Sequence, residues 1–316
     1  MKKFIIKRIL ILLPTILGVT FIVFSIMALS PGDPATLILG VDATMEDITK
    51  LNHELGYDRP FLIRFADYVI NAAKGDFGSS YQTGKPVFED IISRFPATLK
   101  LSSLAILLAV IIGVPLGILS AVKQYSAIDY ISTFTTMFIT AIPGFWLGLM
   151  LMLVFSLQLN LLPSNGIGSY KHYIMPMVTL ALPIMAVLLR LTRATMLETI
   201  RQDYIKTVRA KGAPEYIVIF RHALRNALLP VVTSIGMYFG HLIGGAVLIE
   251  TVFSIPGLGF LIVKAIRMKD IPQVMAAIVF ISVMFMLVML IVDILYGYID
   301  PYIIAILRND PQVMRN

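Results

Sequence analysis

Cysteine is absent from this chain of 316 residues, and charged side chains are scarce. The absence of cysteine excludes disulfide bonds, thiolate nucleophiles and cysteine-based metal sites. Charged residues make up 14% of the chain and hydrophobic residues 58%, and the mean hydropathy is +0.84. A soluble domain of this length would expose much of that apolar surface to water. The composition therefore indicates a protein that crosses a membrane several times.

Residues that could support enzyme chemistry are also scarce and scattered. No second histidine follows the pair His53-Glu54 at metalloprotease spacing. The segment Gly78–Lys85 has five residues between its glycines, and Pro86 replaces the Ser or Thr that a phosphate loop requires. We therefore expect no catalytic residue, no metal site and no nucleotide cofactor in this chain. The four histidines lie in different segments, at His53, His172, His222 and His241.

Six apolar stretches are long enough to cross about 30 Å of hydrocarbon at roughly 1.5 Å per residue. They predict an all-α membrane protein with six transmembrane helices. The first follows several basic residues, as a secretory signal would, but it lacks a small-residue cleavage site and is interpreted as a retained helix. The predicted spans are Ile9–Leu29, Ala97–Val122, Ile131–Leu159, Tyr173–Leu191, Leu229–Ile249 and Val274–Ile299.

The distribution of charge predicts the orientation of these spans. Residues 31–96 contain ten acidic and six basic residues, whereas residues 190–225 contain eight Lys or Arg and three acidic residues. Because basic loops stay in the cytoplasm, the first region should be extracytoplasmic, and the second loop and both termini cytoplasmic. We divide the chain into an N-terminal helix (1–30), an extracytoplasmic region with short amphipathic helices (31–96), a membrane core (97–300) and a cytoplasmic tail (301–316).

The polar loop at about 190–228 is the most informative segment. It has helical periodicity on both sides of Gly212 and Pro214, and it returns to continuous apolar sequence at Leu228. Glycine accepts a left-handed conformation that other residues avoid, and Pro214 can begin a helix because the first helical N–H group needs no partner. The pattern predicts two short helices joined by a rigid turn.

Four separated segments resemble, in order, the first permease subunit of ABC importers for dipeptides, oligopeptides and nickel. The resemblance implies a type I importer permease fold and a non-catalytic subunit. It also implies a homologous second permease, two cytoplasmic ATPases that bind ATP and Mg, and an extracytoplasmic solute-binding protein. The segments are KRILILLPTILGVTFIVFSIMALSPGDPA, LGYDRPFLIRFADYVINAAKGDFGSSY, DYIKTVRAKGAPEYIVIFRHALRNALLPVVT and IETVFSIPGLG.

The general importer pattern in this loop, Glu-Ala-Ala followed after three residues by Gly, places its glycine on Gly212. Lys206, Thr207 and Val208 stand at the Glu-Ala-Ala positions, and His222, Leu224 and Arg225 stand at the later Ile, Leu and Pro positions. These departures resemble the peptide-importer branch. A basic segment resting on anionic lipid is the alternative interpretation, but it requires no particular glycine. The predicted ATPase-coupling residues are Lys206, Thr207, Val208, Arg209, Ala210, Lys211, Gly212, Ala213, Pro214 and Glu215.

Small residues in two spans predict close helix packing. Gly236, Gly240 and Gly244 repeat every four residues and share one helix face. Plain packing explains such a face as readily as a substrate pathway does, but His241 adds an ionisable group that is costly at membrane depth. We predict that these four residues line the pathway or a subunit interface. Gly113–Gly117 is a second close-packing site.

The remaining polar residues leave alternatives open. Glu250 lies where the fifth span leaves the membrane, and Ser254–Gly259 predicts a turn near the outer mouth that could belong to a gate. Asp293 could serve ion coupling, although a buried acid paired with a base is the commoner finding. A secondary transporter would favour paired intramembrane acids and an internal repeat, neither of which stands out. An ATP-driven peptide importer is therefore preferred, with a nickel or metal-chelate importer as the alternative.

Overall fold

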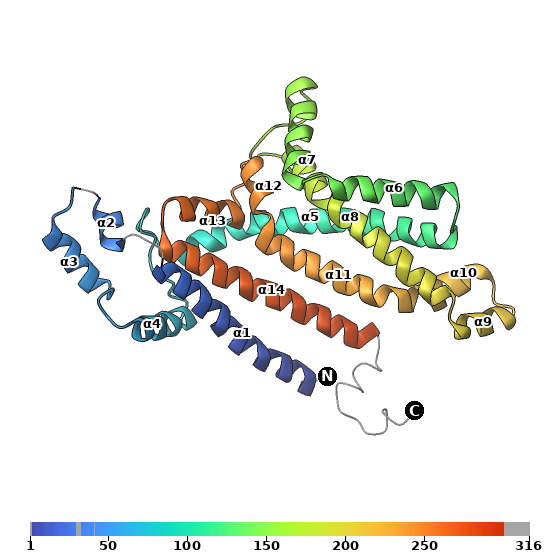
Figure 1. The fold of residues 1–316 in the computed structure, drawn as a ribbon, viewed down its shortest axis with the longest axis horizontal. Coiled ribbons are helices and arrows are strands. Elements are labelled where there is room, and N and C mark those ends of the chain that lie inside the picture. Colours follow the sequence, from blue (N-terminus) through green and yellow to red (C-terminus); the bar gives the residue numbers. More distant parts are fainter. Residues whose placement is uncertain (1, 30–32, 41, 300–316) are drawn as a thin grey trace.

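The computed structural model describes residues 2–29, 33–40 and 42–299, and within these ranges the chain is built from helices (Figure 1). An isolated antiparallel bridge joins Ser79 to Pro86. Asp300 and the predicted tail 301–316 lie outside the described residues. The elements are α1 (Lys2–Leu29), α2 (Pro34–Leu39), α3 (Met45–Glu54), α4 (Phe61–Ala73), α5 (Val87–Val122), α6 (Ala127–Ala141), α7 (Gly144–Leu151), the π-helical η1 (Met152–Gln158), α8 (Lys171–Ile200), α9 (Asp203–Ala210), α10 (Glu215–Ile217), the π-helical η2 (Val218–Ala223), α11 (Leu224–Gly245), α12 (Val247–Val252), α13 (Leu258–Arg267) and α14 (Ile271–Ile299).

Within the described residues, five helices are long and apolar enough to cross a membrane, and a bent pair supplies a sixth candidate span. The bent pair corrects the prediction of one straight span at Ile131–Leu159: helix 127–141 and helix 144–158 meet at an angle of 95°. Ile142 is extended because a residue before proline avoids the helical conformation, and Pro143 follows it. The break therefore has a local cause that the apolar composition conceals.

Two other predicted boundaries also differ from the structure. Helix α5 begins at Val87 rather than Ala97, and it includes Pro96, so the helix of the second predicted span extends back through residues 87–96. Helix α11 ends at Gly245, before the predicted end at Ile249, and the chain then turns into the separate helix α12. At α5 one helix continues across a change from polar to apolar sequence, and at α11 apolar sequence continues past the end of the helix, so hydropathy locates neither boundary.

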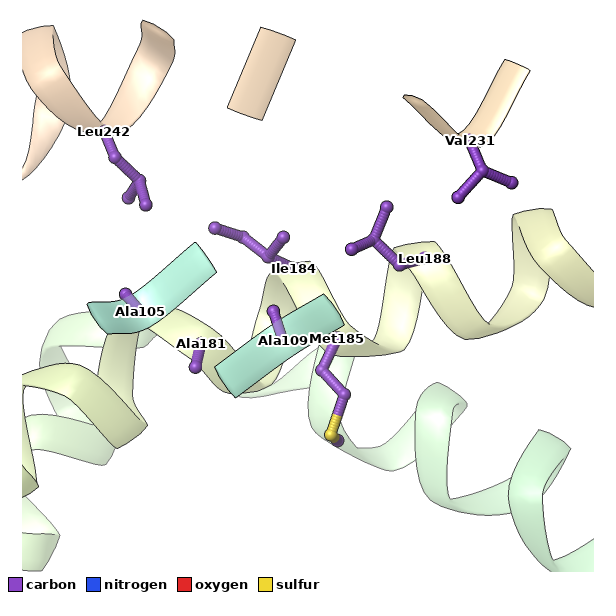
Figure 2. Close-up of a cluster of buried hydrophobic side chains, with 8 residues drawn as sticks. All are labelled: Ala105, Ala109, Ala181, Ile184, Met185, Leu188, Val231 and Leu242. Atoms are coloured by element: carbon purple, nitrogen blue, oxygen red, sulfur yellow. The ribbon is translucent and has the colours of Figure 1, made fainter. Parts of the chain in front are cut away.

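The core is formed by α5, α8, α11 and α14. Helices α5 and α8 pack along much of their length, α11 covers both, and α14 packs against α11 and α1. Figure 2 shows the central cluster, in which small residues of α5 allow the larger side chains of α8 to approach and α11 closes the cluster from above. Its members are Ala105, Ala109, Ala181, Ile184, Met185, Leu188, Val231 and Leu242.

Glycines bring α5 and α8 into backbone contact, as their spacing predicts. A Cβ atom on Gly113 would lie 2.8 Å from the Met185 carbonyl oxygen, and one on Gly117 would lie 2.7 Å from the Leu189 carbonyl oxygen. These distances leave no room for a side chain, because the obstructing atoms belong to a backbone that cannot rotate away. The pair is therefore a fixed unit of the core.

The two ends of the bundle carry different structures. Helices α2, α3, α4 and α13 lie at the end opposite α9 and α10 (Figure 1). We call the first the distal end. The predicted amphipathic helices of the N-terminal region are present there as α3 and α4. Phe61 and Phe65 of α4 pack edge-on against Phe21 and Phe24 of α1, with ring centroids 5.2–5.9 Å apart.

Candidate functional site: the elbow between α8 and α11

Residues 203–223, which we call the elbow, connect α8 to α11 at the end opposite the distal end. Helix α9 ends at Ala210, and Gly212 then adopts a φ of +81°. Nothing lies within 4 Å of a Cβ atom on Gly212, so this position requires glycine for its backbone conformation rather than for space. Pro214 precedes α10 in an extended conformation, and the chain continues through η2 into α11. The predicted pair of short helices around a glycine turn is thus present.

An ion pair braces the glycine turn. The Arg209 guanidinium donates to both carboxylate oxygens of Glu215, with Nη2 2.6 Å from Oε1 and Nε 3.1 Å from Oε2. Both side chains are partly exposed, so the pair contributes at most about 1 kcal/mol, but its two-point geometry fixes α9 relative to α10. Lys206 donates to Asp203 at 2.8 Å, and this hydrogen bond lowers the pKa of the Asp203 carboxyl. These pairs lie within the predicted coupling segment.

The inner face of the elbow is buried against the core. Ile205 and Val218 are fully buried, and they pack with apolar residues of α5, α8 and α11. A force on the elbow therefore reaches three core helices directly. The cluster consists of Ile118, Ala121, Met196, Ile205, Val218, Ile219, Ala223 and Ala227.

The opposite face of the elbow is exposed and combines aromatic with basic side chains. Tyr216 and Phe220 are 66% and 62% exposed. Lys206, Arg209 and Lys211 of the elbow are also exposed. Large exposed aromatic residues on a charged surface are typical of protein contacts, where aromatic and Arg side chains contribute most of the binding energy. The elbow thus has an inner face packed against the core and an outer face exposed to solvent.

A buried ion pair joins the first turn of α6 to α8, and sequence reasoning missed it. Asp129 is 3% exposed and accepts two hydrogen bonds from Arg193, from Nε at 2.6 Å and from Nη2 at 2.8 Å. It also accepts from Ser120 Oγ at 2.5 Å and from the Tyr125 amide at 3.0 Å. An acid just before one predicted span and an arginine just after another were the available signals, but the partners are 64 residues apart.

The predicted glycine face of α11 lies against α14 of the same chain. A Cβ atom on Gly240 would lie 2.6 Å from the Phe285 ring, and one on Gly244 would lie 2.8 Å from Ile281. Gly236 meets Val292 in the same way. His241 is exposed and does not share this contact. These glycines pack two helices within the chain, and a pathway role for the four residues stays a prediction.

The segments considered for enzyme chemistry are apart from the elbow. His53 pairs with Asp58 at 2.7 Å on the exposed surface, and residues 80–84 form a turn at the distal end. Within the described ranges no three His, Asp or Glu side chains gather as metal ligands would. Asp293 has an interaction partner, as expected for an acid in a membrane helix.

Known proteins resemble nearly the whole chain. Residues 1–102 and 113–304 match the N-terminal and main parts of the family described as binding-protein-dependent transport system inner membrane component. A dipeptide transport system permease protein of Alkalihalophilus pseudofirmus is 40% identical over 96% of this chain and 99% of its own length. A glutathione transport system permease protein of Escherichia coli K12 is 42% identical, with the same coverage.

A solved structure supports the same fold. The MetNI methionine ABC transporter in an inward-facing conformation matches 66% of this chain and 96% of its own, with a TM-score of 0.55 and 18% identity. At that identity the likeness concerns the fold alone. Together, the helical bundle, its membrane-spanning helices and the two matched regions show that this chain belongs to the family of binding-protein-dependent transport system inner membrane components, the multi-pass permease subunits of ABC transporters.

Proposed function

We propose that this chain forms the transport pathway of an ATP-driven importer for short peptides and that its elbow receives the movement of an ATP-binding subunit. The observation that carries the proposal is the construction of the elbow. Its turn is held by Gly212 and by the Arg209–Glu215 pair, its inner face is buried against α5, α8 and α11, and its outer face is free. A rigid element of this kind transmits a rigid-body displacement to the core helices.

The charge distribution supports the orientation. The elbow contains four Lys or Arg residues against two acids, and α1 begins with basic sequence, whereas residues 33–90 are rich in acids. Under the positive-inside rule, the elbow and both termini are cytoplasmic and the distal end is extracytoplasmic. The elbow then faces the compartment that contains ATP.

The remaining parts of the importer follow from this assignment. The chain pairs with a homologous second permease, two cytoplasmic ATP-binding subunits supply ATP and Mg chemistry, and an extracytoplasmic solute-binding protein delivers the cargo. This subunit itself is non-catalytic. The peptide class rests on the two relatives whose names specify a dipeptide and glutathione, since each aligns with 96% of the chain. The nickel alternative has no comparable support.

Uptake by the complete complex in proteoliposomes tests the proposal. With ATP supplied on the elbow side and the solute-binding protein on the other, we expect labelled dipeptide to accumulate at least about tenfold faster than without ATP, a difference of about 1.4 kcal/mol in activation free energy. Ionophores should leave this rate unchanged. Uptake driven by an ion gradient without ATP would identify a secondary transporter, and ATP-driven uptake of nickel but not peptide would contradict the peptide assignment.

A further inference from the structure

Glu250 of α12 is a fully buried carboxylate at the distal end, with an exposed fraction of 0%. Its Oε1 atom accepts from the Thr98 hydroxyl at 2.6 Å, and its Oε2 atom accepts from the Phe260 amide at 3.1 Å. Among the described residues, no Lys, Arg or His lies within ion-pair distance of it. Because a buried carboxylate without a cation depends on its hydrogen-bond donors, Glu250 requires these particular neighbours.

The same two side chains satisfy the N-terminus of α13. The first amides of a helix have no partner within it, and here the Leu258 amide donates to Thr98 Oγ1 at 2.8 Å while the Phe260 amide donates to Glu250. The acceptors for these amides therefore come from α5 and α12 rather than from the helix's own N-cap residue, Gly257. A Cβ atom on Gly257 would overlap the Glu250 carboxylate carbon at 2.5 Å. This contact explains why residue 257, in the segment Ser254–Gly259, is glycine.

The other end of α13 is also held. Asp270 is 3% exposed and accepts from the Ser80 hydroxyl and, at 3.1 Å, from the Tyr81 amide. Between these points Leu258, Leu261 and Ile262 pack against Val87 and Ile91 of α5. Helices α12 and α13, residues 247–267, thus form one body at the distal end of the bundle, which we call the cap (Figure 1).

The cap is connected to the elbow by a single helix. Helix α11 follows directly from η2 of the elbow, and at its other end it turns into α12, which carries Glu250. Its 22 residues span about 33 Å at 1.5 Å per residue. A movement of the elbow therefore reaches the cap along a continuous helix, whereas Glu250 and Thr98 attach the cap to α5.

We propose that Glu250 and Thr98 are positioning residues that fix the cap on α5 and thereby close the distal end of the transport pathway until α11 moves. This inference rests on the proposed function for the existence of a pathway, but the attachment of the cap is a property of the chain itself. Loss of either side chain leaves buried amides of α13 without acceptors, which favours detachment of the cap. A cap released from α5 leaves the distal end of the pathway unclosed, so ATP hydrolysis continues without equivalent transport.

The test uses Thr98→Val, which removes the hydroxyl at nearly constant volume, and Thr98→Ser, which retains it. Each is combined with Ile255→Cys in the cysteine-free chain. Ile255 lies in the turn between α12 and α13 and is 0% exposed, so its labelling rate reports how often the cap detaches. The complete complex is purified, and the rate of maleimide labelling, ATP hydrolysis and dipeptide uptake are measured. We expect Thr98→Val to raise the labelling rate about tenfold and to lower the amount of peptide transported per ATP at least fivefold. Thr98→Ser should leave both quantities close to those of the unaltered chain.

Glu250→Gln provides a second, independent variant, because it keeps the size of the side chain and weakens its acceptance from the amides. It should change labelling and coupling in the same direction as Thr98→Val. Unchanged labelling, or raised labelling with unchanged transport per ATP, in Thr98→Val and Glu250→Gln would overturn the proposal. If the unaltered complex shows no ATP-driven uptake, the proposed function fails, whereas the labelling rates still report whether Glu250 and Thr98 hold the cap.

Discussion

Replacing Gly117 by leucine is expected to lower the yield of folded permease about tenfold or more. A Cβ atom there would lie 2.7 Å from both the Leu189 carbonyl oxygen and Thr192 Cβ, so α5 and α8 would have to separate. Overpacking of a core usually costs about 1–3 kcal/mol, and this site is at the upper end because backbone atoms form the obstacle. The measurement is the amount of monodisperse protein after detergent extraction and size-exclusion chromatography, relative to total chain.

Gly18→Leu is the matched control for this change. Gly18 lies in the membrane helix α1, and no atom within 4 Å would meet its Cβ atom. The same added volume should therefore leave the yield within about twofold of the unaltered chain. Equal losses from both variants would show that leucine in any membrane helix interferes with insertion. The loss of yield in Gly117→Leu could then not be attributed to close packing of α5 on α8.

Replacing Gly212 by valine is expected to reduce peptide uptake about tenfold or more while the chain still reaches the membrane. A β-branched residue at a φ of +81° is strained by about 1–3 kcal/mol, and relief of that strain moves α9 relative to α10. The displaced elbow should lose its ATP-binding subunits on purification or hydrolyse ATP without transport. Uptake, ATPase retention and membrane content of the chain are measured together.

Two variants separate coupling from other causes. Gly75 has a φ of +86° and no atom within 4 Å of its Cβ position, so Gly75→Val imposes the same kind of strain at the distal end and should retain its ATPases. Arg209→Gln removes an exposed ion pair that contributes at most about 1 kcal/mol, so it should lower uptake less than Gly212→Val does. A segment that merely rests on lipid would give the opposite order, tolerating Gly212→Val and responding to the loss of charge at Arg209.

Local patterns in the sequence predicted much of the fold and of the elbow. Apolar length located the membrane helices because the bilayer demands about twenty residues of any span. Gly212 was identifiable because a glycine between two helical patterns has few roles other than a left-handed turn. The spacing of Gly113 and Gly117 predicted a close contact, and the structure places Met185 and Leu189 of α8 against them.

Long-range partners were beyond these patterns. Glu250 meets Thr98 from 152 residues away, and nothing near either residue indicates the other. The glycines of α11 illustrate the same limit: their spacing shows that they share a face, but not that Phe285 and Val292 of α14 fill it. Sequence periodicity describes one element at a time, whereas these sites are made by pairs of elements.

Cross-linking from the elbow tests the central claim most directly, because the chain contains no native cysteine. Lys211 is exposed beside Gly212. Gln82 is exposed and donates to the Met268 carbonyl at the end of α13, so Lys211→Cys and Gln82→Cys report on opposite ends of the bundle. Each variant is treated in the assembled complex with a thiol-specific photoreactive cross-linker, and in intact cells with an impermeant thiol reagent.

The account predicts that Lys211→Cys forms a covalent product with an ATP-binding subunit and is protected from the impermeant reagent in intact cells. Gln82→Cys should react with that reagent and form no product with the ATP-binding subunit. A complex that retains its ATPases but cross-links to them from Gln82→Cys instead, or that exposes Lys211→Cys to the outside, would contradict both the orientation of the chain and the role of its elbow.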